Sequence, residues 1–168
     1  MADTSLRVGI GYDVHGFAPE GTDRPLIVGG VSVPHTRGLQ GHCDADVLIH
    51  AVVDALLGAA VLGDIGTHFP SGDERWRDAP STRFLEYTME LLRARGWRVV
   101  NVDATVVAER PRLTPHVPAM RERLAGIMAL DVDIVSVKAK TTDGLGFTGR
   151  GEGVACHAVA LIERSGAA

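Results

Sequence analysis

The central segment of the chain, residues 45–62, has the sequence ADVLIHAVVDALLGAAVL. Apolar residues recur at helical spacing around most of this segment, which predicts a largely buried helix capped by Asp44 or a neighbouring residue. Asp46, His50 and Asp54 recur every four positions on the narrow remaining side, so they fall on one helical row. The segment therefore predicts a core helix with a single polar row.

The segments on either side of this helix predict a sheet and further helices. Helical spacing predicts a helix from Ser81 or Thr82 to Gly96 and another over residues 118–130. Short apolar or alternating runs predict strands over residues 6–12, 26–33, 97–108, 134–142 and 154–162. The order ββααβαββ, with a strand-helix-strand crossover, predicts an α+β fold: a two-layer sandwich with a mixed β-sheet and helices on one face.

Composition limits the class of protein. A chain of 168 residues with 45% hydrophobic and 23% charged residues predicts one folded domain over residues 1–168. The formal net charge of -4 argues against nucleic acid or an anionic membrane as a partner, and no apolar run is long enough to span a bilayer. Two cysteines, Cys43 and Cys156, cannot form a disulfide framework, so we expect free thiols and a cytoplasmic location.

A metal site is suggested where the first predicted strand ends. Asp13 and His15 directly follow its apolar run, and alternate positions along a strand point to the same side. Together with His50 they form the three-ligand set of a catalytic zinc site with one open position, and Asp46 or Asp54 could orient His50. The alternative is that each histidine is an ordinary polar residue with a local hydrogen bond.

Residues 144–153, GLGFTGRGEG, form the densest glycine segment. They match the dinucleotide-binding fingerprint in letters, but a strand follows rather than a helix, so a Rossmann site is rejected. Backbone groups with Thr141, Thr142 and Arg150 could still bind phosphate, and Asp143 or Glu152 could hold magnesium. The alternative is a turn-rich hairpin.

Several motifs together resemble one enzyme family. These are GYDVH at residues 11–15, GHCDADV at 41–47, LGDIG at 62–66, NVD at 101–103 and FTGRGEG at 147–153. In this order they resemble 2-C-methyl-D-erythritol 2,4-cyclodiphosphate synthases over nearly the whole chain. The resemblance implies a homotrimer of the non-mevalonate isoprenoid pathway, with active sites between protomers. It also implies a reaction in which 4-diphosphocytidyl-2-C-methyl-D-erythritol 2-phosphate closes to the cyclic diphosphate and releases CMP.

The same resemblance implies roles for particular residues. Asp13, His15 and His50 match the zinc ligands, while His42 and Thr141 match residues that position or polarise the phosphates during catalysis. Asp143 stands where the family usually has a Glu that binds magnesium or manganese, and its shorter side chain is a departure from that pattern. A second departure is Cys43, which replaces a frequent Ser.

Substrate contacts are implied for a larger set of residues. Residues 64–66 would contact the methylerythritol, and residues 108–114 with 139–143 would form a cytidine pocket. Phe147 and Arg150 would line the trimer axis, where the family can hold an isoprenoid diphosphate. The full implied set is Asp13, His15, His42, Cys43, Asp64, Ile65, Gly66, Phe69, Asp73, Ala108, Arg112, Leu113, Ala139, Lys140, Thr141, Thr142, Asp143, Phe147 and Arg150.

Two other functions compete with this interpretation. The first is a metal-dependent hydrolase of nucleotide diphosphates that uses the metal to activate water. The second is a non-catalytic trimeric module that binds an isoprenoid diphosphate and keeps its metal for structure. An open ligand position argues against the second, because structural zinc sites are usually closed by four protein ligands.

Overall fold

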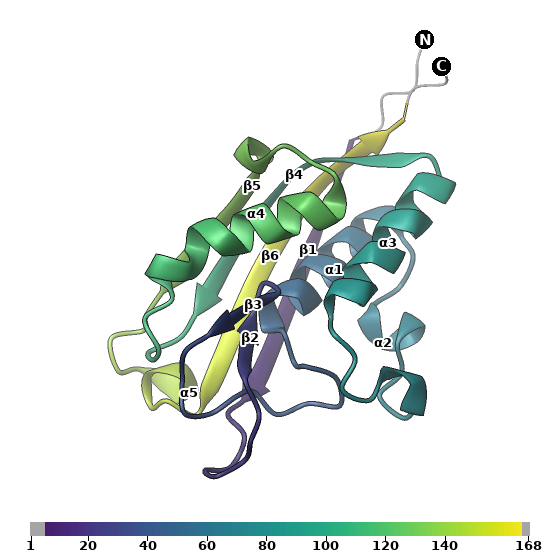
Figure 1. The fold of residues 1–168 in the computed structure, drawn as a ribbon. Helices are drawn as coiled ribbons and strands as arrows, with labels where there is room; N and C mark the ends of the chain where they lie inside the picture. Colours follow the sequence, from purple (N-terminus) through teal and green to yellow (C-terminus); the bar gives the residue numbers. More distant parts are fainter. Residues whose placement is uncertain (1–5, 166–168) are drawn as a thin grey trace.

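The computed structural model describes residues 6–165, and its centre is a four-stranded mixed sheet (Figure 1). The strands lie in the order β1-β6-β4-β5. Both β1 and β4 run antiparallel to β6, whereas β4 and β5 are parallel and are joined by a helical crossover. Their bounds are β1 Leu6–Gly16, β4 Trp97–Val107, β5 Val135–Lys140 and β6 Gly153–Arg164. The predicted α+β class with a mixed sheet is confirmed.

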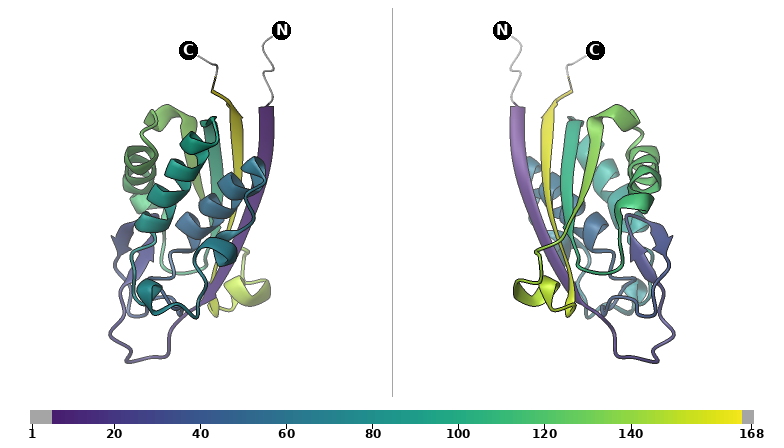
Figure 2. Two further views of the ribbon diagram at one scale, coloured as in Figure 1. Left: turned by 90° about the vertical axis from the view of Figure 1, so that its right-hand side faces the viewer. Right: turned by 90° about the vertical axis from the view of Figure 1, so that its left-hand side faces the viewer.

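Three longer helices cover one face of this sheet, which gives the predicted two layers (Figure 2). They are α1 (Val47–Ala60), α3 (Thr82–Ala94) and α4 (Val117–Met128). The short helix α5 (Gly146–Gly149) projects from the opposite face at one end of the sheet. The remaining short turns are α2 (Ile65–His68), η1 (Glu74–Trp76), η2 (Thr114–His116) and η3 (Val132–Ile134).

One predicted strand is in fact two short strands. Residues 26–33 make a hairpin rather than one strand, with β2 (Leu26–Val28) and β3 (Val31–Val33) paired only to each other. The chain reverses at Gly29 and Gly30, whose φ angles of 63° and 69° lie in the left-handed region that glycine adopts readily. The hairpin therefore stands beside the main sheet, next to the start of α1.

The hairpin is fixed to α1 by a buried carboxylate. Asp46 is the N-cap of α1, and its side chain accepts hydrogen bonds from the backbone N–H groups of Leu48 and Ile49. The same carboxylate accepts from the N–H groups of Gly29 and Gly30 at 2.8 and 2.6 Å. Asp46 is fully buried, and all of these bonds compensate for the loss of its hydration.

Helix α1 lies unusually close to β1. The odd-numbered residues of β1 face the helix, and two of them are glycines. A Cβ atom at Gly9 would lie 2.0 Å from the carbonyl oxygen of Ala55, and one at Gly11 would lie 1.9 Å from that of Ala51. The helix backbone can approach the strand this closely only because both positions lack a side chain, and this approach brings His50 to β1.

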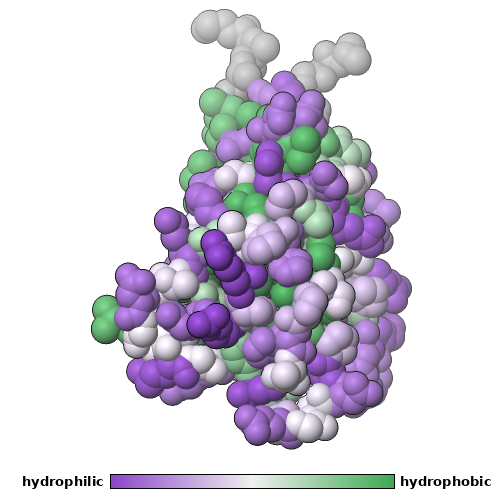
Figure 3. Space-filling view, turned by 60° about the vertical axis from the view of Figure 1, so that its left-hand side comes forward, coloured by the Kyte–Doolittle hydropathy of each residue, from purple (hydrophilic) through white to green (hydrophobic). Residues whose placement is uncertain are grey.

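The even-numbered residues of β1 face away from the helices and are apolar. Val8, Ile10 and Tyr12 are 66%, 71% and 49% exposed, and Val14 and Val159 continue this apolar outer face. Figure 3 shows a different side of the molecule, where hydrophilic residues are interspersed with apolar ones in the upper half and dominate the lower end. Among residues 6–165, no helix is both long and apolar enough to cross a membrane.

Candidate metal centre and substrate cavities

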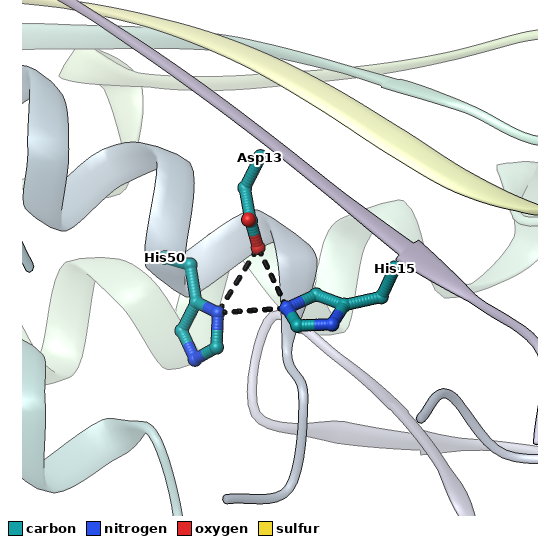
Figure 4. Close-up of side chains that lie close together, drawn as sticks. All are labelled: Asp13, His15 and His50. Atoms are coloured by element: carbon teal, nitrogen blue, oxygen red, sulfur yellow. Dashed lines mark hydrogen bonds and ion pairs between the residues drawn. The ribbon is translucent and has the colours of Figure 1, made fainter. Parts of the chain in front are cut away.

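Asp13, His15 and His50 converge on one point (Figure 4). Asp13 and His15 come from β1, which extends beyond Tyr12 to Gly16, and His50 comes from the first turns of α1. Oδ2 of Asp13 lies 3.0 Å from Nε2 of His15 and 3.0 Å from Nδ1 of His50, and the two nitrogens are 3.2 Å apart. The sequence prediction that these three side chains meet is confirmed.

The donor set fits a tetrahedral zinc ion. Zn–N and Zn–O bonds of about 2.0–2.2 Å place neighbouring ligand atoms roughly 3.3 Å apart in tetrahedral geometry. The three separations are close to that value. The far nitrogen of His15 is already committed, since Nδ1 donates to the carbonyl oxygen of Gln40 at 2.8 Å. With Nδ1 committed as a donor, Nε2 is the nitrogen of His15 that remains to bind a cation in the triangle.

Electrostatics couple the three residues further. Burial disfavours the charged form of Asp13, but hydrogen bonds from His15 and His50 outweigh burial and hold the pKa of Asp13 below its ordinary value. Burial likewise opposes protonation of His50, yet its bonds to Asp13 and Cys43 raise the pKa of His50 to about 10. The proton on His50 lies where an ion would bind, so metal binding must displace it.

Neither of the acidic residues expected to orient His50 does so. Asp46 is occupied by the four N–H groups already described, and Asp54 accepts a hydrogen bond from the backbone N–H of Ile65 at 2.7 Å. Instead, Nε2 of His50 lies 2.8 Å from Oγ of Ser81 and 3.3 Å from Sγ of Cys43. Sequence spacing misses Ser81, because it is distant in the chain and reaches His50 only through the packing of α3 on α1.

The metal triangle opens into a cavity of about 230 Å³. Several of the implied substrate-binding residues line it, and so do three aromatic side chains. The rings of Phe69 and Phe84 stack at 4.4 Å, and Trp76 meets Phe69 edge-on at 5.1 Å. Sequence reasoning missed Trp76 and Phe84. The lining residues are Asp13, His15, His42, Cys43, His50, Ile65, Gly66, Phe69, Ser71, Trp76 and Phe84.

Two implied residues support this cavity from its rim. Asp64 is the N-cap of α2 and accepts hydrogen bonds from the backbone and side chain of Thr67 at 2.8 and 2.7 Å. Asp73 caps η1, and its carbonyl oxygen lies 3.1 Å from Nε2 of His42. These contacts fix the two loops that carry residues 64–66 and 70–73 beside the metal triangle.

A second cavity, of about 300 Å³, lies where β4 and β5 end. It brings together the two segments expected to bind cytidine, although they are separated by more than twenty residues of sequence. Thr141 belongs to this cavity and not to the one that holds His42, so the two implied catalytic residues lie in different cavities of one chain. The lining residues are Ala108, Glu109, Arg110, Arg112, Leu113, Thr114, Ala139, Lys140 and Thr141.

The loop after β5 carries the remaining implied residues. Asp143 has a left-handed backbone with φ of 52°, and its carboxylate accepts a hydrogen bond from Oγ1 of Thr141 at 3.2 Å. Among residues 6–165 it joins no cluster of possible metal ligands. Thr142 bonds to the carbonyl oxygen of Leu145, Phe147 lies in α5, and exposed Arg150 pairs with Glu152 at 2.8 Å.

Comparisons with known proteins agree with this fold and site. A family model described as the YgbB family matches residues 6–163. A protein of Xanthomonas oryzae pv. oryzae named 2-C-methyl-D-erythritol 2,4-cyclodiphosphate synthase is 55% identical over 160 residues, which are 95% of this chain and 96% of that protein. The chain therefore belongs to the YgbB family. Its relatives within that family include the 2-C-methyl-D-erythritol 2,4-cyclodiphosphate synthases.

Two solved structures extend the comparison. The bifunctional IspDF of Campylobacter jejuni superposes with a TM-score of 0.91 at 38% identity, over 96% of this chain and 43% of that longer protein. The IspF of Plasmodium falciparum, in a complex with CDP, has a TM-score of 0.82 at 30% identity, over 95% of this chain and 97% of that one. A similar fold therefore binds a cytidine nucleotide in that relative.

Proposed function

We propose that this chain converts 4-diphosphocytidyl-2-C-methyl-D-erythritol 2-phosphate into 2-C-methyl-D-erythritol 2,4-cyclodiphosphate and CMP, a step of the non-mevalonate isoprenoid pathway. The observation that carries the proposal is the triangle of Asp13, His15 and His50, whose donor atoms converge at a cavity. The name of the relatives supplies the product, and the CDP complex of one relative supports a cytidine-linked substrate.

The reaction is a phosphoryl transfer within one molecule. An oxygen of the 2-phosphate forms a bond to the β-phosphorus while the bond from that phosphorus to the CMP oxygen breaks, so no water is consumed. Zinc, when bound by the triangle, would polarise the β-phosphate under attack. His42, on the wall of the same cavity, would hold the phosphate in line, and positioning of this kind is a large part of phosphoryl-transfer catalysis.

Thr141 and Asp143 would act on the same diphosphate, Thr141 by positioning the phosphates and Asp143 through a second metal ion. Asp143 is the proposed ligand of magnesium or manganese, a hard cation that typically takes one or two carboxylates and several phosphate oxygens. The hydrogen bond from Thr141 already orients the Asp143 carboxylate beside the cavity at the end of β5. That cavity is the proposed cytidine site.

A homotrimer with shared active sites would bring the two cavities together. Along one row of the sheet, Asp13 on β1 is followed by Cys156, Val106 and Ala139 on β5. Three strand spacings, about 14 Å, therefore separate the metal edge from the cytidine edge within a chain. We propose that the metal edge of one protomer meets the cytidine edge of the next and that the apolar outer face is buried in this assembly.

Placing a charge on the apolar outer face is expected to separate the protomers. Ile10→Asp should yield a monomer by analytical ultracentrifugation, because an aspartate cannot be buried unpaired between subunits. Turnover should be lost, while the metal triangle, built within one chain, should still bind zinc. Val61→Asp is the control, since Val61 is 77% exposed at the end of α1, away from this face. A trimer of Ile10→Asp would refute the proposed interface.

Two further parts of the proposal concern ligand and location. Phe147 lies in α5 and Arg150 ends it, and α5 lies on the face of the sheet opposite the longer helices. These two residues would line the trimer axis, where an isoprenoid diphosphate could bind. We also propose a cytoplasmic enzyme, because Cys43 and Cys156 are both buried free thiols, as is usual for a reducing compartment.

Phosphorus NMR of the purified protein with substrate, zinc and magnesium tests the proposed function. The cyclic diphosphate and CMP are the expected products. Linear diphosphate or monophosphate products would instead identify a nucleotide-diphosphate hydrolase. Binding of zinc and cytidine nucleotide without turnover would identify a non-catalytic module.

A further inference from the structure

Ser81 occupies a capping position but does not cap. It is the N-cap residue of α3, where a serine side chain normally accepts a hydrogen bond from an N–H group of the first helical turn. Ser81 makes no such bond, although it is fully buried. Its hydroxyl instead contacts the carboxylate of Asp44 and lies 2.8 Å from Nε2 of His50. The side chain of Ser81 therefore contacts the proposed metal ligand His50 and does not cap the helix.

The direction of the protons follows from the chemistry of Asp44. An ionised carboxylate only accepts hydrogen bonds. Oδ2 of Asp44 accepts from the backbone N–H of Ser81 at 2.9 Å, and Oδ1 accepts from its hydroxyl. Since the hydroxyl proton of Ser81 points to Asp44, its oxygen has lone pairs available for the Nε2–H of His50. The proton of a neutral His50 then resides on Nε2, and Nδ1 presents its lone pair to the metal triangle.

We propose that Ser81, held by Asp44, is a positioning residue that fixes the tautomer and ring orientation of His50 for metal binding. Neither Ser81 nor Asp44 lines the metal cavity, so both act through His50 and not on the substrate. Cys43 lies farther from the same nitrogen, at 3.3 Å, and its sulfur is a weaker acceptor. The inference rests on the metal half of the proposed function.

Zinc affinity of the metal-free protein, measured by competition with a chelator, tests this role. Ser81→Ala should weaken zinc binding about tenfold to a hundredfold, the usual effect of removing a partner of a metal-bound histidine. It should lower kcat with little change in KM, because Ser81 does not touch the substrate. Ser81→Thr, which retains the hydroxyl, should restore both.

Asp44→Asn is the sharper variant because it preserves shape and should fold. The amide oxygen must accept from the N–H of Ser81, so the amide NH₂ would face the Ser81 oxygen and donate to it. The hydroxyl proton would then turn toward Nε2 of His50 and favour the tautomer that carries hydrogen on Nδ1. Zinc affinity should therefore fall as in Ser81→Ala.

Thr88→Val is the matched control, because Thr88 is a fully buried hydroxyl of the same helix that bonds only to the carbonyl oxygen of Phe84 at 2.8 Å. It should lower stability without changing zinc affinity. Wild-type zinc affinity in both Ser81→Ala and Asp44→Asn would overturn the inference. If the wild-type protein bound zinc as expected but formed no cyclic product, the proposed reaction would fail while the positioning role stood.

Discussion

Replacing His50 with alanine is expected to abolish turnover and deplete the protein of bound zinc. His50 supplies one of three donor atoms, and its ring is almost fully buried between β1 and α3, where no solvent ligand has equivalent access. A Lewis-acid contribution of several kcal/mol corresponds to at least about a thousandfold in rate. Steady-state assays of CMP release and metal analysis of the purified variant measure the two effects.

A second histidine provides the control for this substitution. His35 bonds to Arg37 and packs beside Phe17, away from the metal cavity, so His35→Ala should keep its zinc and its activity. Circular dichroism of both variants shows whether the fold is intact. A folded His50→Ala protein that turns over at the wild-type rate without zinc would contradict the metal assignment.

Gly11→Ala is expected to produce the largest loss of stability of any single methyl group added to the sheet. The new Cβ would lie 1.9 Å from the carbonyl oxygen of Ala51, so α1 and β1 must separate. Overpacking usually costs about 1–3 kcal/mol of folding stability. Because this clash is between the β1 strand and the backbone of α1, and not a flexible side chain, the cost should reach or exceed the upper end of that range. That is a large share of a typical domain stability of about 5–15 kcal/mol. Chemical denaturation at one fixed protein concentration measures the change.

Gly58→Ala is the matched control within the same pair of elements. A Cβ at Gly58 would lie 4.0 Å from the carbonyl oxygen of Ile10, which is an ordinary van der Waals contact. Alanine within a helix should raise stability by roughly 0.5–1 kcal/mol relative to glycine. An unchanged denaturation midpoint in Gly11→Ala would show that the strand does not depend on this close approach.

The close approach of α1 to β1 also explains which part of the site the sequence can predict. Asp13 and His15 share a side of a strand by parity, and His50 is marked by its place on the polar row of a buried helix. The distance between these segments depends on Gly9 and Gly11, whose importance emerges only when the helix is seen to lie on them. Local patterns therefore identify the ligands, and long-range packing brings them together.

The prediction for the supporting residues was wrong for the same reason. Asp46 and Asp54 share the helical row of His50, but Asp46 caps the helix and Asp54 binds the start of α2. Ser81 and Asp44 hold His50 although neither lies on that row. A serine before an apolar helix indicates a cap, and nothing in the sequence indicates that its hydroxyl is used elsewhere.

The pairing of the strands could not be predicted from the sequence either. The sequence predicts one strand over residues 26–33, whereas Gly29 and Gly30 fold that segment back on itself. The order β1-β6-β4-β5, which places the metal and cytidine groups at opposite edges of the sheet, is likewise not indicated by any local pattern. That separation is one of the observations behind the proposal of a site shared between protomers.

The most direct test of the proposed cyclisation follows the fate of oxygen. The protein would be incubated with its substrate in water enriched in the heavy oxygen isotope, with and without zinc and magnesium, and the products analysed by mass spectrometry. We predict equal amounts of CMP and cyclic diphosphate, no heavy oxygen in either, and no products after the metals are removed. Heavy oxygen in a linear phosphate product would contradict the proposed cyclisation, because water and not the 2-phosphate would then be the nucleophile.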